Sequence, residues 1–259
     1  MNNRFLVTIA LGFSFSTSTQ ATLVTRGIDM VYDDVNNITW AADANLFQTQ
    51  AASNSLLVSQ IIAANGGVIH DTPNGYDSTG TYTLTTADFT ASTGTMTWWG
   101  AQAWANDLTL GGVTGWTLPA TSDAGNPDNY GFSITTSQLG NLFYNQLGGV
   151  ANSSITTTHN TGYSLFSNVQ NSTYWSSSEY IPSPYLAWVF NTSIGYQDHY
   201  RTKDYQFYAW AVHAGDVAAV PLPGAVWLFL TGLLGLMGLK RRVITNMDFV
   251  IALVDDKTL

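Results

Sequence analysis

Predominantly apolar runs lie near both ends of the chain, and shorter alternating patterns fill the part between them. At the N-terminus Arg4 supplies a positive charge, Phe5 to Phe15 form a short apolar run, and small polar residues lead to Thr19-Gln20-Ala21. A basic start, an apolar stretch and a small-residue cleavage site are the parts of a secretory signal peptide. The pattern therefore predicts a signal peptide over residues 1–21 and export of the mature protein.

The second apolar run, Val220 to Leu239, carries no charge and is followed at once by three basic residues, Lys240, Arg241 and Arg242. A helix of about 20 apolar residues spans about 30 Å, the thickness of a hydrocarbon core. A basic cluster at the end of such a helix stays on the cytoplasmic side. Residues 220–242 are thus predicted to form a transmembrane helix, with residues 243–259 as an atypical cytoplasmic tail.

Between the two ends, the apolar spacing predicts short strands, turns and a few helices. Val31-Tyr32 and Ile38-Thr39-Trp40 flank Asn36-Asn37, an arrangement that suits a hairpin within residues 22–47. Residues 68–94 are rich in Thr, Gly and Asp and indicate a second hairpin or a surface excursion. Three segments show apolar residues at near-helical spacing and are predicted as helices: 52–64, 98–108 and 137–147, the last capped by Thr135 or Thr136.

The region from residue 174 onward is predicted to be a run of strands. Leu186, Trp188 and Phe190 alternate with the residues between them, and a period of two is the mark of a sheet. The predicted strands are 174–180, 185–192, 195–200 and 206–213.

Composition narrows the classes of function. The chain has no cysteine, which excludes thiol catalysis, thiolate metal sites and disulfides. Between Thr22 and Ala219 three bases face 14 acids, and Glu179 is the one glutamate in that span. Because so acidic a surface repels phosphate backbones, nucleic acid is not expected as a partner.

Six motifs in a fixed order carry a resemblance to a known family. They are YDDVNNITWAADAN (32–45), MTWWGAQAWANDL (96–108), GWTLP (115–119), YWSSSEY (174–180), AWVFNTSIG (187–195) and YAWAVHAGDV (208–217). Together they resemble the Lcl C-terminal domain family, which is found in a collagen-like adhesin and in many exported bacterial proteins. The resemblance covers residues 26–217 and leaves 48–94 as an insertion.

This resemblance implies a C-type-lectin-like α+β domain over residues 22–217. Two or three helices would pack against short twisted antiparallel strands, and loops would carry binding. Where the family commonly has arginine, this chain has Thr117 and His213. Guanidinium groups that could pair with a buried acid such as Glu179 are therefore missing.

The C-terminal run resembles the PEP-CTERM sorting signal recognised by exosortases. Its motif is Val220-Pro221-Leu222-Pro223, similar to the VPLPA subclass, followed by an apolar helix and the basic cluster. The resemblance implies the export machinery and an exosortase as partners, and an exopolysaccharide-producing cell with a Gram-negative-type envelope. The continuation over residues 243–259 departs from the family, whose chains usually end soon after the basic cluster.

No catalytic constellation emerges from the spacing of reactive residues. The histidines are far apart in sequence and form no metal-binding pair, and Ser176-Ser177-Ser178 lacks a nucleophile elbow and a base. Asp33, Asp34 and Asp43 supply the hard oxygen ligands that calcium prefers, so calcium is the one candidate cofactor. Turn formation explains the same residues.

Tyrosines crowd the last predicted strands and are the main candidates for binding. Tyr180, Tyr185, Tyr196 and Tyr200 are predicted to form a binding face, since rings can cover the apolar face of a sugar while their hydroxyls stay wet. The leading hypothesis is a non-enzymatic, exported surface or matrix protein that acts by adhesion or polysaccharide association. The alternatives are an exported glycan-active enzyme, which would need paired carboxylates, and a purely structural envelope protein.

Overall fold

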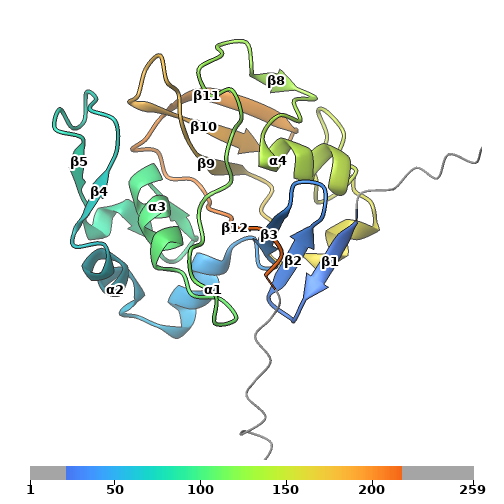
Figure 1. Cartoon of the computed structure of the whole chain (residues 1–259), viewed down its shortest axis with the longest axis horizontal. Coiled ribbons are helices and arrows are strands. Elements are labelled where there is room, and N and C mark those ends of the chain that lie inside the picture. Colours follow the sequence, from blue (N-terminus) through green and yellow to red (C-terminus); the bar gives the residue numbers. More distant parts are fainter. Residues whose placement is uncertain (1–21, 218–259) are drawn as a thin grey trace, which may run out of the picture. The chain divides into compact units, whose positions relative to one another are not determined.

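Two four-stranded antiparallel sheets form the frame of residues 22–217, the part of the chain that the computed structural model describes (Figure 1). The first sheet has the order β1-β2-β3-β12 and the second β8-β11-β10-β9. Two-stranded ribbons, β4-β5 and β6-β7, accompany them. The fold is therefore mixed α+β with mostly antiparallel sheets and few helices, the class that the resemblance implies.

The first sheet joins the two ends of the described region. Its strands are β1 (Leu23–Arg26), β2 (Met30–Asp33), β3 (Ile38–Ala41) and β12 (Val212–Ala214). The turn between β2 and β3 is stabilised by Asp33, whose Oδ1 accepts from the backbone N–H of Asn36, and Asn37 adopts a left-handed φ of 49°. The hairpin predicted within residues 22–47 is confirmed, with one further strand on each side of it.

The second sheet is built from β8 (Gly131–Phe132), β9 (Thr173–Glu179), β10 (Leu186–Asn191) and β11 (Tyr196–Thr202). All residues of β10 from Leu186 to Phe190 are buried, so both of its faces are covered. The predicted strand is confirmed, but its alternation does not separate a core face from a solvent face. The strand predicted at 206–213 is wrong over most of its length. Its first residues make only isolated bridges, from Phe207 to Met96 and from Tyr208 to Tyr174, and the strand β12 begins only at Val212.

The helices are short. They are α1 (Leu46–Ser53), α2 (Leu57–Ala64), α3 (Trp98–Asp107) and α4 (Gln138–Asn141), the last continued by a π-helical turn η2 (Leu142–Gln146), with 3₁₀ turns η1 (Thr86–Asp88) and η3 (Thr161–Leu165). The helix predicted at 98–108 is confirmed, and Thr97 caps it by accepting from Gly100 N–H at 3.2 Å. The helix predicted at 52–64 is instead two helices, because Asn54 turns the chain by accepting from Leu56 N–H.

The predicted cap of the helix at 137–147 is wrong. Ser137, not Thr135 or Thr136, accepts from Gly140 N–H at 2.9 Å and begins α4. Ser137 has the extended backbone that an N-cap requires, with φ −89° and ψ 155°.

Residues 68–94 form a hairpin, β4 (Val68–His70) with β5 (Thr81–Thr83), and a ribbon, β6 (Phe89–Thr90) with β7 (Thr95–Met96). The hairpin prediction is confirmed. The segment also contributes buried side chains, among them Leu84, Asp88 and Phe89, so it belongs to the core rather than lying on top of it.

Aromatic residues build the core of this cysteine-free chain. The fully buried tryptophans are Trp40, Trp99, Trp104, Trp116, Trp175, Trp188 and Trp210. Their indole N–H groups mostly find acceptors, as when Trp210 donates to Ala41 O at 2.8 Å and Trp175 to Met96 O at 2.9 Å. Large rings therefore supply both the apolar burial and fixed cross-links between distant segments.

No helix within residues 22–217 has the length and apolar character needed to cross a bilayer. The predicted signal peptide (1–21), the transmembrane segment (220–242) with its sorting motif and basic cluster, and the tail (243–259) lie outside the described residues.

Candidate functional site

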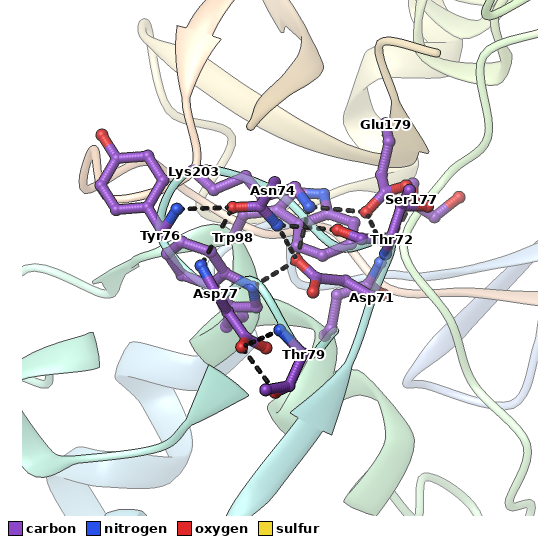
Figure 2. Close-up of polar contacts among 12 residues, drawn as sticks. Asp71, Thr72, Asn74, Tyr76, Asp77, Thr79, Trp98, Ser177, Glu179 and Lys203 are labelled. Atoms are coloured by element: carbon purple, nitrogen blue, oxygen red, sulfur yellow. Dashed lines mark hydrogen bonds and ion pairs between the residues drawn. The ribbon is translucent and has the colours of Figure 1, made fainter. Parts of the chain in front are cut away.

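A buried lysine joins two acids from distant parts of the chain. Lys203 follows β11, and its side chain has 0% exposure. Its Nζ lies 2.6 Å from Asp71 Oδ2 and 2.5 Å from Glu179 Oε1 (Figure 2). We call Asp71, Glu179 and Lys203 the buried triad.

Aromatic and amide groups hold the members of the triad in place. Asp71 follows β4, and its Oδ2 also accepts from Trp99 Nε1 at 2.9 Å and from Asn74 Nδ2 at 3.1 Å. Glu179 ends β9 and accepts from the backbone N–H of Thr72 at 3.2 Å. The ammonium lies 4.3 Å from the centroid of the Trp98 ring, within the range of a cation–π contact. The triad thus ties the β4-β5 hairpin to the ends of two strands of the second sheet.

An open groove with a volume of about 740 Å³ runs beside the triad. Its walls include Thr72, Pro73, Ser177 and Ile181, and Glu179 reaches it with 18% of its side chain exposed. We call it the triad groove.

Paired acids raise the question of glycoside hydrolysis, which needs one carboxyl to protonate the leaving group and another to face water or the sugar. In the triad, the side chain of Asp71 has no exposed surface, and both acids share one ammonium. The groove therefore offers a substrate one partly exposed carboxylate, Glu179, rather than a facing pair.

Sequence reasoning missed Asp71 and Lys203. A signal was available, because Lys203 is the one lysine and Glu179 the one glutamate between Thr22 and Ala219. In a chain with so few charges of these kinds, each needs a partner if it is buried. The resemblance leads one to expect arginine at positions 117 and 213 as partners of a buried acid. In this chain Lys203 supplies the positive charge that pairs with Glu179.

A second site lies on the outer face of the second sheet. Along β11 the side chains of Tyr196, Asp198 and Tyr200 are at least partly exposed, while the alternate residues Gln197 and His199 are buried. Phe132, from the neighbouring strand β8, meets Tyr196 edge to face with ring centroids 4.8 Å apart.

Tyr130 extends this row of rings. Its centroid lies 6.4 Å from that of Tyr196 and 6.2 Å from that of Tyr200. We call Tyr130, Phe132, Tyr196 and Tyr200 the aromatic face.

Polar side chains line a groove beside these rings. The groove has a volume of about 270 Å³ and includes Phe132, Tyr196, Asn191, Asp198 and Arg201 in its lining. Arg201 Nη2 lies 3.1 Å from Asp198 Oδ2, and Asp198 Oδ1 accepts from the backbone N–H of Tyr200. This aromatic groove therefore presents rings, a carboxylate and a guanidinium on one surface.

The structure brings only part of the predicted tyrosine face together. Tyr196 and Tyr200 belong to the aromatic face, and Tyr200 is 59% exposed. Tyr185 is exposed but precedes β10, and it does not line the aromatic groove. Tyr180 is only 8% exposed, because it packs on Trp188 and on the ring of His199, so its place on the binding face is wrong. Tyr130, Phe132, Asp198 and Arg201 were missed, although the alternation from 196 to 200 was a signal for Asp198.

Below the aromatic face lies a buried histidine. The His199 ring is 4.1 Å from Tyr180 and 4.0 Å from Tyr200, centroid to centroid. Neither of its ring nitrogens has a hydrogen-bond partner among the described residues. Burial lowers the pKa of the imidazole, against a smaller opposite effect of the nearby Asp198 carboxylate.

The calcium candidates serve as turn and capping acceptors. Asp33 accepts from Asn36 and from Gln146 Nε2, and Asp43 Oδ2 accepts from Thr49 Oγ1 and Asn168 Nδ2. Asp34 Oδ1 accepts from Thr22 N–H. Within residues 22–217 no group of three or more histidines or acids converges to hold a metal ion. The turn interpretation accounts for Asp33 and Asp43, which accept from backbone N–H groups two or three residues on, whereas Asp34 binds the residue before β1.

Comparison with known proteins adds no relative. No family model matches the chain, and neither the curated proteins nor the solved structures contain a significant match. The resemblance to the Lcl C-terminal domain and to the PEP-CTERM signal stays a prediction from motifs.

Proposed function

We propose that the chain is an exported cell-surface or extracellular-matrix protein whose domain at 22–217 is lectin-like and binds polysaccharide without catalysis. The observation that carries the proposal is the aromatic face with its adjoining groove. The rings of Phe132, Tyr196, Tyr130 and Tyr200 lie in a continuous row with neighbouring centroids between 4.8 and 6.4 Å apart. Rows of exposed rings next to fixed polar groups suit a ligand with apolar faces and hydroxyl edges.

The polar groups of the aromatic groove match the hydroxyls of a sugar. Asp198 can accept and Arg201 can donate, and their mutual contact holds both in position. The groove, at about 270 Å³, is slightly smaller than typical ligand pockets, which run from about 300 to 1,000 Å³. It would therefore hold one sugar ring, while Tyr130 and Tyr200 extend the contact along a polymer.

The test is binding of the full chain to an array of neutral and acidic polysaccharides, with and without chelator. Tyr196→Ala and Phe132→Ala should each weaken binding about 5- to 30-fold, the effect of losing roughly 1–2 kcal/mol of ring contact. Tyr205→Ala is the matched control, because Tyr205 is an exposed tyrosine outside the groove lining. Failure to bind any polysaccharide would contradict the proposal. Loss of binding in the presence of chelator would show that binding depends on a metal ion such as calcium.

An exported glycan-active enzyme is the second candidate, since Asp71 and Glu179 meet beside the triad groove. Release of reducing ends by the wild-type chain, abolished by Glu179→Gln, would establish it. A purely structural envelope role is the third candidate and predicts neither binding nor turnover.

The sorting part of the proposal rests on Val220-Pro221-Leu222-Pro223 and on Lys240, Arg241 and Arg242. An exosortase would cut near Pro223 after the C-terminal helix has anchored the chain in the inner membrane. Mass measurement of the mature protein tests this proposal. Finding residues 240–259 still attached would mean a permanent membrane anchor.

A further inference from the structure

The buried triad places an amine against a carboxyl group, and both of these side chains are shielded from water. Lys203 and Asp71 both have 0% side-chain exposure, and Nζ lies 2.6 Å from Asp71 Oδ2. Atoms held this close and shielded from solvent have the proximity that turns a slow bimolecular reaction into a fast intramolecular one. A third group, Glu179, contacts the same nitrogen at 2.5 Å.

We propose that Lys203 and Asp71 become joined by an amide bond, which the folded chain forms by itself with Glu179 as the proton carrier. The product is an intramolecular cross-link between a lysine and an aspartate side chain. It requires no oxidant and no cofactor, because the reaction is a condensation.

The reaction balances as the loss of one water molecule. One proton passes from the Lys203 ammonium to Glu179, which acts as a general base. The freed lone pair on Nζ attacks Cγ of Asp71, and a C–N bond forms. A second proton from nitrogen and the proton held by Glu179 pass to one Asp71 oxygen, the C–O bond breaks, and that oxygen leaves as water. Nitrogen keeps its last proton as the amide N–H, and Glu179 returns to a carboxylate.

The surroundings of Asp71 assign a role to each of its oxygens. Oδ2 accepts from Trp99 Nε1 and Asn74 Nδ2, two donors that would stabilise the negative charge of a tetrahedral intermediate. Oδ2 therefore remains as the amide carbonyl. Oδ1 is buried and has no hydrogen-bond partner among the described residues, so it is the oxygen that leaves.

Burial favours the product over the ion pair. Two opposite charges taken out of water carry a desolvation penalty that their attraction repays only in part. Amide formation removes the charges of Lys203 and Asp71, although it also removes the cation–π contact with the Trp98 ring 4.3 Å from Nζ. The Glu179 carboxylate keeps its charge at the edge of the triad groove. Water can leave through the triad groove, which Glu179 reaches with its exposed edge.

The amide bond would stabilise the folded chain in the way that a disulfide stabilises other proteins. Asp71 and Lys203 are 132 positions apart, and the chain has no cysteine. Closing so long a loop restricts the unfolded state, which stabilises the folded one. The cross-link would fasten the β4-β5 hairpin to the end of β11.

The test is a tryptic map of the full chain after denaturation. An unmodified Lys203 is cut by trypsin, whereas an acylated one is not. We expect no cleavage after Lys203, and we expect the peptide that begins at Thr202 to be covalently joined to peptide 27–201. The joined species should be lighter than the sum of its two peptides by the mass of one water molecule. Because 27–201 contains both Asp71 and Glu179, a second digestion or fragmentation must assign the carboxyl.

Variants separate the parts of the proposal. Lys203→Arg and Asp71→Ala should abolish the link, and Glu179→Gln should leave Lys203 free because the proton carrier is gone. Asp216→Asn, in the ion pair with Arg26 outside the triad, is the control that should keep the link. Complete cleavage after Lys203 in the wild-type chain, a link on Glu179 instead of Asp71, or a link that persists in Glu179→Gln would overturn it. The wild-type map decides the main point even if a variant does not fold.

Discussion

The ring of Tyr82 lies flat on the indole of Trp99, with centroids 3.8 Å apart and planes only 3° from parallel. The same indole donates to Asp71, so the stack on the β4-β5 hairpin supports one wall of the buried triad. Tyr82 also donates its hydroxyl to Asp88 Oδ1 at 2.9 Å. Burial is the largest of the causes that raise the pKa of this phenol.

Truncating Tyr82 should therefore lower the free energy of unfolding more than truncating Tyr76, which contacts the same indole. Tyr82→Ala removes the stack and the hydrogen bond, and we expect the free energy of unfolding to fall by about 2–3 kcal/mol. Tyr82→Phe should cost about 1 kcal/mol, the hydrogen bond alone. Urea unfolding measures both. Tyr76→Ala is the control, since Tyr76 meets the same Trp99 only edge-on at 5.7 Å. An equal loss in Tyr76→Ala would contradict the role of the stack.

Position 94 requires glycine for two reasons, its backbone conformation and the lack of space for a side chain. Its φ is +86°, and a Cβ built there would lie 1.9 Å from Asn45 Oδ1. Asn45 is buried, and its Nδ2 donates to Gln48 Oε1 and to Thr93 O, so its side chain has little freedom to move.

We expect Gly94→Ala to lower the free energy of unfolding by about 2–4 kcal/mol, from strain and overpacking together. Gly66→Ala should cost about 1–2 kcal/mol, since Gly66 has a φ of +64° but nothing within 4 Å of its Cβ position. Gly75→Ala, with open space and no positive φ, should change it by less than about 0.5 kcal/mol. Thermal or urea unfolding of the three variants checks the order, and a different ranking would refute it.

His199 should make the domain less stable in mild acid. Burial lowers its pKa below the value of about 6.5 that it has in the unfolded chain. In the window below about pH 6.5 the unfolded state binds more protons than the folded state, so the free energy of unfolding falls as the pH falls. Above that value both states are neutral at this site, and its contribution is constant.

Replacing His199 by phenylalanine should remove this part of the pH dependence. Unfolding measured from pH 7 to pH 5 should show a shallower loss in His199→Phe than in the wild-type chain. Phe132→Ala is the control, because Phe132 carries no titrating group and should leave the slope unchanged. Parallel curves for wild type and His199→Phe would show that the imidazole does not titrate differently in the two states.

The charge of the domain predicts which polysaccharides it binds. Of the three bases within residues 22–217, Lys203 is buried, Arg26 pairs with Asp216 at 2.5 Å, and Arg201 lines the aromatic groove beside Asp198. With 14 acids in the same span, a polyuronate would meet repulsion. A neutral polysaccharide should bind more tightly than a polyuronate, and its binding should change little with salt.

Arg201→Ala should weaken that binding about 5- to 30-fold, the loss of a donor pair worth roughly 1–2 kcal/mol. Arg26→Ala should leave it unchanged. Titration calorimetry or retention on immobilised polysaccharide measures the ratio at low and high salt. Tighter binding of the polyuronate would contradict the prediction of a neutral ligand, but it would still support the proposal that the domain binds polysaccharide.

Elements with strong local signals were predictable. The β2-β3 turn, α3 and the strands β9 to β11 follow from turn residues and short-range periodicity, which are properties of neighbouring residues. The split of α1 from α2 and the cap at Ser137 depend on which of several suitable polar residues the packing selects. Burial of Tyr180 depends on Trp188 and His199 from two other strands, which no local pattern reports.

The candidate sites also divide into a part that local sequence pattern predicted and a part that depends on tertiary structure. Alternation along 196–200 was enough to put Tyr196 and Tyr200 on one face of a strand, because side chains in a strand point alternately to its two sides. The joining of Asp71, Glu179 and Lys203 was decided by tertiary structure, since these residues are separated by 24 to 132 positions and meet only when the hairpin packs on the sheet. Composition revealed a chain with few charges and no cysteine, but burial and contact decided which charges pair, because pairing depends on the folded geometry.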